Sequence, residues 1–191
     1  MEFLAQLWLP ILVSAVVVFF GSFIAWMVLP HHRADVKKLP DESALMEFLK
    51  KHRPPPGLYM WPNCATSEEM KSDEYKQRYK DGPWGSMTVV GAQPNFGRNL
   101  TLTFLFYIVV GVFVAYITTE ARAPGAAYLE VFQVAGATAV LAYCAGSIPG
   151  ALFFGKPTRF IFTELLDGFV YGLLTAGVFA WLWPEAAAAV G

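Results

Sequence analysis

The distribution of hydrophobic and polar positions divides the chain into four long apolar segments and one polar stretch. The apolar segments cover residues 3–29 and approximately residues 99–118, 128–153 and 160–183. A helix needs roughly 20 apolar residues to cross the hydrocarbon core of a bilayer, so each segment is long enough to span it. The pattern predicts an all-α transmembrane fold, a four-helix membrane bundle with a small α+β insertion between its first two helices.

The breaks between these segments define four expected parts of the chain. The first segment ends at a basic flank and has no basic residues before it, so we expect a retained helix and not a cleaved signal peptide. The parts are a first transmembrane helix (1–30), a loop domain (31–98), three further transmembrane helices (99–184) and a short C-terminal tail (185–191).

The loop domain has the pattern of a small mixed unit. Asp41 can cap an amphipathic helix that continues to residue 53, and the capping-box pattern of residues 66–69 begins a polar helix that reaches about residue 80. Residues 58–61 and 86–90 are strand candidates that could pair with each other. About 68 residues with few large aliphatic side chains make a marginally stable unit.

Aromatic residues are numerous in this loop domain. The favoured interpretation is that they form its core, and the alternative is a surface that docks another protein. The docking hypothesis concerns Tyr59, Trp61 and Trp84.

Composition supports a membrane protein and narrows the range of partners. Hydrophobic residues make up 55% of the chain and charged residues only 15%, against about 25% in a typical soluble domain. The net charge of -1 argues against nucleic-acid binding. We expect membrane lipids and other membrane-protein subunits as partners, and no cofactor, although the apolar helix surfaces leave room for a bound lipid.

Basic residues predict the orientation of the chain in the membrane. Eleven of the 14 Lys and Arg residues lie between Arg33 and Arg98, and Lys156 and Arg159 lie in the loop between the last two apolar segments. With four spans, these two loops share one side. The positive-inside rule then places loop 31–98 in the cytoplasm and both termini outside, in the periplasm.

Small residues recur every four positions in the last two apolar segments, which favours close approach of two helix backbones in lipid. The sequence predicts that these stripes pack on each other. They comprise Thr138, Ala142, Gly146 and Gly150 in the third segment, and Gly168, Gly172, Ala176 and Ala180 in the fourth.

Two carboxylates, Asp167 and Glu164, lie in the first turns of the fourth apolar segment. A carboxylate at this depth is costly and normally faces a partner or water. One interpretation is an ion or proton site beside the third segment. The favoured interpretation is structural, either an ion pair with Lys156 or Arg159 or a carboxylate near the positive N-terminus of its helix.

His31 and His32 follow the first apolar segment. Adjacent residues of an α-helix point about 100° apart, so the two are not expected to bind one metal, and the sequence predicts no metal site. Walker, HExxH, GxSxG and GxGxxG motifs are absent from the sequence, which argues against an enzyme and gives no catalytic residues.

Several stretches resemble a family of bacterial multi-pass inner-membrane proteins to which no activity is assigned. They are Met27-Val28-Leu29-Pro30-His31-His32-Arg33-Ala34-Asp35, Lys38-Leu39-Pro40-Asp41-Glu42, Pro55-Pro56-Gly57-Leu58-Tyr59-Met60, and residues 167–177. The resemblance implies a bacterial inner-membrane location and brings no functional residues with it.

These observations favour a non-catalytic accessory or scaffolding subunit of a larger inner-membrane complex. The alternative is a small oligomeric transporter or proton-linked channel that uses Asp167 and Glu164. A membrane enzyme is the third hypothesis, and it requires Asp167, His31 or His32 beside a cleft open to lipid.

Overall fold

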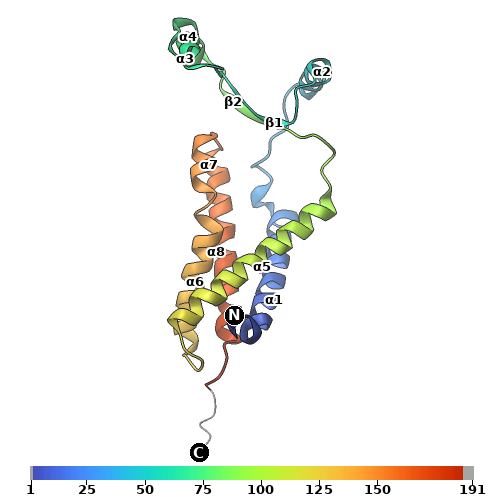
Figure 1. Ribbon diagram of the computed structural model, residues 1–191. Helices are drawn as coiled ribbons and strands as arrows, with labels where there is room; N and C mark the ends of the chain where they lie inside the picture. The colour runs from blue at the N-terminus through green and yellow to red at the C-terminus, as the bar shows by residue number, and fades with distance from the viewer. Residues whose placement is uncertain (1, 187–191) are drawn as a thin grey trace, which may run out of the picture. The chain divides into compact units, whose positions relative to one another are not determined.

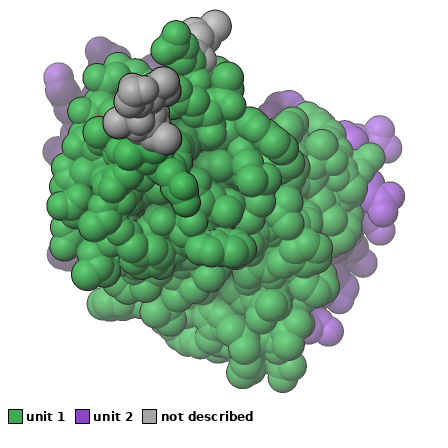
Figure 2. Space-filling model, turned by 90° about the horizontal axis from the view of Figure 1, so that it is seen from below, with its two compact units in different colours: residues 1–36, 95–191 green, residues 37–94 purple. Residues whose placement is uncertain are grey.

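The computed structural model describes residues 2–186 and divides into two compact units. Unit 1 comprises residues 1–36 and 95–191, and unit 2 comprises Lys37–Pro94; Figure 2 colours them separately. The predicted loop domain began at residue 31, but residues 30–36 belong to unit 1 because their side chains bind the last helix, as described below. Residues 187–191 of the expected C-terminal tail lie outside the described residues.

Unit 1 contains four helical segments that are long and apolar enough to cross a membrane, as the sequence predicted. They appear in Figure 1 as α1 (Glu2–Phe23) with its π-helical continuation η1 (Ile24–Val28), α5 (Phe96–Ala121), α6 (Tyr128–Cys144) followed by α7 (Ile148–Phe153), and α8 (Thr158–Trp181).

Successive long helices of unit 1 run antiparallel. The most extensive packing joins α6 to α8, while α1 packs on α5 and α8, and α5 crosses α6 obliquely (Figure 1). Two hydrogen bonds tie the segment after α8 to the turn between α5 and α6. Trp183 Nε1 donates to Ala123 O at 3.0 Å, and Gly125 N donates to Pro184 O at 2.8 Å.

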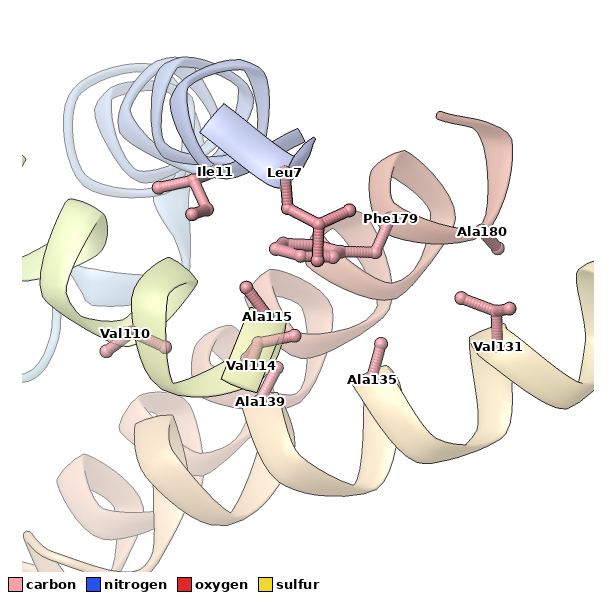
Figure 3. Packing of buried hydrophobic residues seen from close by; sticks show 10 residues of the cluster. All are labelled: Leu7, Ile11, Val110, Val114, Ala115, Val131, Ala135, Ala139, Phe179 and Ala180. Atoms are coloured by element: carbon pink, nitrogen blue, oxygen red, sulfur yellow. The ribbon is translucent and has the colours of Figure 1, made fainter. Parts of the chain in front are cut away.

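The main hydrophobic core of unit 1 surrounds Phe179, which is fully buried. Figure 3 shows its ring beside Leu7 of α1 and close to Val114 and Ala115 of α5. The same cluster includes Ile11, Val110, Val131, Ala135, Ala139 and Ala180. All four long helices therefore meet in the half of the bundle that contains the C-terminal ends of α5 and α8.

The small-residue stripe predicted on α8 is buried, whereas the predicted stripe on the third segment is wrong. Gly168, Gly172, Ala176 and Ala180 are all buried on α8. On α6 the buried positions are Val131, Ala135, Gly136 and Ala139.

The other predicted stripe residues lie away from this contact. Thr138 is partly buried and Ala142 is exposed, and a Cβ built on Gly146 or Gly150 would have no atom within 4 Å. Small residues occur on more than one face of this helix, so a spacing of four residues does not identify the packed face. In addition, α6 ends at Cys144, so Gly146 and Gly150 of the predicted stripe lie beyond the helix. Residues 145–147 form a turn ahead of α7, which contains Pro149.

Unit 2 has the mixed composition of elements that the sequence predicted. It contains α2 (Glu42–His52), α3 (Ser67–Lys71) and α4 (Asp73–Asp81), together with the antiparallel strands β1 (Gly57–Trp61) and β2 (Gly85–Val89). Asp41 caps α2 by accepting a hydrogen bond from Ala44 N, and Thr66 caps α3 in the same way. The predicted polar helix is divided at Ser72, which has an extended backbone and caps α4.

The aromatic residues of unit 2 do not form an enclosed core, which corrects the favoured interpretation. No residue between 37 and 94 is buried, and all of these residues are described. The side chains of Trp61 and Trp84 stay 41% and 61% exposed, although Trp84 Nε1 donates to Tyr79 O and Tyr59 OH donates to Pro55 O.

Candidate metal centre

The segment that follows the first span places two histidines side by side. The wide π-helical turns of η1 end where Leu29 N donates to Ile24 O, and Leu29 then adopts an extended backbone. Pro30 begins the short 3₁₀ turn η2 (Pro30–His32). The α-helical geometry behind the sequence prediction does not apply here, and the two imidazole rings lie with centroids 4.2 Å apart.

Both histidines reach the same carboxylate. His31 Nε2 lies 2.9 Å from Asp167 Oδ1, and His32 Nε2 lies 2.9 Å from Asp167 Oδ2. Tyr171, one turn further along α8, donates its hydroxyl to Asp167 Oδ2 at 3.2 Å. Asp167 is therefore held by groups from both ends of the sequence, and its predicted ion pair with Lys156 or Arg159 does not form.

A second carboxylate, Asp35, positions His32 from the other side. Its Oδ2 lies 2.8 Å from His32 Nδ1 and accepts a hydrogen bond of 2.7 Å from Thr163 Oγ1. Arg159 binds Asp35 Oδ1 at 2.9 Å and donates to His31 O at 2.6 Å. Two residues of α8 thus fix the carboxylate that orients the imidazole of His32.

This cluster is shielded from solvent. The side chains of Asp35, His32 and Asp167 are 0%, 4% and 9% exposed, and that of His31 is 24% exposed. The Trp26 ring stacks on His32 with centroids 3.8 Å apart and planes 6° apart. Packing of this kind locks the imidazole in one orientation.

The electrostatics around Asp35 favour its ionised form. The hydrogen bond from Thr163 lowers the pKa of the Asp35 carboxyl below its usual value, and the contacts with His32 and the charge of Arg159 act in the same direction. Burial opposes these effects without cancelling them. Asp35 Oδ2 occupies Nδ1 of His32, which leaves Nε2 as the ring atom that faces Asp167.

The residues fit the requirements of a divalent metal ion. One ligand atom from each of His31, His32 and Asp167 lies within 4.8 Å of the others. Tetrahedral bonds of about 2.0–2.1 Å place neighbouring ligand atoms about 3.3 Å apart, which a small adjustment of these side chains provides. The Asp35–His32 contact also matches the carboxylate–histidine–metal arrangement that orients ligands in metalloproteins.

A cavity of about 410 Å³ adjoins the cluster. Its polar wall includes Asp167, Glu164 and Ser147, and its other walls are mainly aromatic. Glu164 itself is paired with Lys156, at 3.5 Å between Oε2 and Nζ, and no contact joins it to either histidine among the described interactions. The two carboxylates that the sequence treated as one site therefore have different partners, the histidines for Asp167 and Lys156 for Glu164, although both line this cavity.

Sequence reasoning missed the roles of Asp35, Thr163 and Tyr171. The spacing His32-x-x-Asp35 was the one available signal, since residues three apart meet within a single tight turn. The contact of this turn with α8 spans more than 120 positions of sequence and has no local signature.

Comparison of the chain with models of protein families, with curated protein sequences and with solved structures finds no match.

Proposed function

We propose that the protein is a membrane protein that binds one divalent transition-metal ion through His31, His32 and Asp167. The observation that carries this proposal is the convergence of two imidazoles and one carboxylate, with a second carboxylate orienting one imidazole. Buried ionisable groups near a membrane span are costly unless a partner neutralises them. A bound cation supplies that partner for Asp167.

The ligand types favour a first-row transition metal. Imidazole nitrogen suits Zn²⁺, Fe²⁺, Cu²⁺ and Ni²⁺, whereas Mg²⁺ and Ca²⁺ prefer sites made of oxygen ligands. Two histidines and one aspartate leave at least one coordination position for a further ligand. A three-ligand site of this kind suits reversible binding or chemistry at the metal better than a purely structural role.

The location of the site follows from the basic residues of the sequence. By the positive-inside rule, residues 29–36 and the turn before α8 lie on the cytoplasmic side of the membrane and both termini on the opposite side. The resemblance to bacterial inner-membrane proteins implies that this opposite side is the periplasm. The metal site is then accessible from the cytoplasm.

Transport through a single chain has less support. On the C-terminal side of Tyr171, α8 buries Thr175, Ala176 and Phe179 against the other helices. This packed region leaves no continuous path from the cavity to the opposite end of the bundle. A transporter that uses Asp167 and Glu164 therefore needs an oligomer or a second conformation of these helices.

An accessory role in a larger membrane complex is a second candidate, and it is compatible with metal binding. It is favoured by the exposed side chains of unit 2, where no residue is buried. Purification from the native membrane in mild detergent tests it, because a stoichiometric partner supports the role and a homogeneous homo-oligomer contradicts it.

The metal proposal is tested with the full-length protein in detergent, after removal of the affinity tag. Metal-stripped protein is dialysed against Zn²⁺ or Co²⁺, and bound metal is quantified by mass spectrometry and, for Co²⁺, by its visible spectrum. We expect one ion per chain in the wild type and loss of that ion in H31A, H32A and D167A. His52 belongs to unit 2 and is not one of the cluster residues, so H52A is the matched control and keeps the ion.

The size of the loss in metal affinity distinguishes the proposed ligands from the residue that only orients one of them. Because D35N removes only the carboxylate behind His32, we expect metal affinity to fall about 10- to 100-fold without loss of the site. Equal metal content in D167A and H52A would show that the cluster is a structural link between the segment after α1 and α8, and would refute the proposal.

A further inference from the structure

We infer that the cavity beside the cluster binds an anionic phospholipid, whose headgroup phosphate occupies the free coordination position of the metal. This inference rests on the proposed metal site and assigns its further ligand. The shape of unit 1, the exposure of the cavity walls and the charge of the cluster each support it.

The cavity continues along the bundle as a groove. A second cavity of about 250 Å³ shares four lining residues with the one beside Asp167, which are Trp26, Thr103, Tyr107 and Tyr171. These four side chains come from η1, α5 and α8. The two volumes therefore follow one path between the helices, and the larger falls within the roughly 300–1,000 Å³ range of small-molecule sites.

The walls of this groove include apolar side chains that are exposed on the surface of unit 1. Leu102 and Phe106 of α5 line the larger cavity and are 51% and 50% exposed, while Trp26 is 47% exposed. Phe23 and Met27 line the smaller cavity and are similarly exposed. An amphipathic molecule can enter from the bilayer and keep its apolar tail against these side chains.

A bound divalent metal ion adds positive charge to the polar end of the groove. The charged side chains at the cluster are Asp35, Asp167 and Glu164, opposed by Arg159 and Lys156. Without counting the two histidines, these formal charges sum to one negative charge, and a divalent ion adds two positive charges. An anionic oxygen ligand from the groove neutralises that charge and completes the coordination shell.

A phospholipid supplies both an anionic oxygen ligand for the metal and an apolar body for the groove. Its phosphate supplies an anionic oxygen at the membrane boundary, and its acyl chains extend along the apolar groove. A free phosphate ion supplies only the anionic oxygen, and it gains nothing from the aromatic walls that line most of the cavity.

The test uses delipidated full-length protein in detergent, prepared with Zn²⁺ or with the metal removed. Phosphatidylglycerol and phosphatidylcholine of the same acyl chains are compared by native mass spectrometry, and metal content is measured on the same samples. We expect the Zn²⁺ form to retain phosphatidylglycerol about tenfold or more above phosphatidylcholine, and removal of Zn²⁺ to abolish that preference. This arm needs no variant.

Two threonine variants test the place of binding. Thr103 lines both cavities, whereas Thr101 lines neither; both are exposed and donate their hydroxyls to backbone oxygens four residues earlier. We expect T103W to lose retained phosphatidylglycerol and T101W to keep it, with one Zn²⁺ bound in each.

The outcomes distinguish this inference from the metal proposal. Bound Zn²⁺ with no difference between the two lipids, or with equal lipid retention in T103W and T101W, overturns the lipid site and leaves the metal site standing. Displacement of phosphatidylglycerol by an equal concentration of inorganic phosphate overturns the lipid as occupant. Absence of bound Zn²⁺ in the wild type overturns both proposals.

Discussion

Close packing of α6 on α8 gives a sharp test of the fold at Gly172. A Cβ added there would clash with Val140 Cγ2 and lie 3.0 Å from Val140 N and 3.1 Å from its Cα. Backbone atoms cannot rotate away, and valine has a stiff side chain, so the two helices must separate slightly. Overpacking of this kind costs about 1–3 kcal/mol, and the better helix propensity of alanine offsets up to about 1 kcal/mol.

We therefore expect G172A to lower the free energy of unfolding by about 1–2 kcal/mol. In a thermal unfolding assay of the full-length protein in detergent, this corresponds to a fall in Tm of about 2–8 °C, at roughly 2–4 °C for each kcal/mol. G146A is the matched control, because a Cβ at Gly146 has no atom within 4 Å. A Tm of G172A equal to that of G146A would refute the close contact between α6 and α8.

Three further predictions concern the core, the metal site and the cap of α2. Phe179 is fully buried, so F179A should lower the free energy of unfolding by about 3–5 kcal/mol, and an unchanged Tm would contradict the core in Figure 3. Arg159→Gln removes the cation that holds Asp35, so the affinity for Zn²⁺ should fall. K156Q removes the pair with Glu164 and the contact with the Phe160 ring, neither of which involves a proposed metal ligand, so it should leave the affinity unchanged. The hydrogen bond from Ala44 N to Asp41 lowers the pKa of the Asp41 carboxyl below its usual value of 3.8. The ionised cap therefore stabilises α2 fully above pH 3.8, and this stabilisation is lost as the pH falls through the folded-state pKa of Asp41. An NMR titration should show the pKa of Asp41 below 3.8 and acid fraying of α2 that is absent in D41N; equal fraying in D41N would contradict the role of the charge.

The elements of this protein were largely encoded in local sequence. Uninterrupted apolar segments predicted, within a few residues, the four helices long and apolar enough to cross a membrane, because such a length of apolar sequence is visible without knowing its neighbours. Capping residues such as Asp41 and Thr66 predicted the starts of helices in unit 2, since a cap acts on its own first turn. The two short strands were also predictable, although their register was not.

Contacts between distant segments depended on the tertiary structure. The repeat of small residues in the third span fitted more than one stripe, and only the position of α8 selected Ala135, Gly136 and Ala139 as the packed face. His31 and His32 were judged by α-helical geometry, but the π-helical end of α1 and the 3₁₀ turn that follows it bring both rings to Asp167. The sequence by itself determined the long apolar helices and the presence of a carboxylate within the last of them, because these depend on residues close together in the chain. Only the fold decided that His32 and His31 are the partners of this carboxylate. They lie 135 and 136 positions away from Asp167 in the sequence, and local sequence patterns carry no information about contacts over such separations.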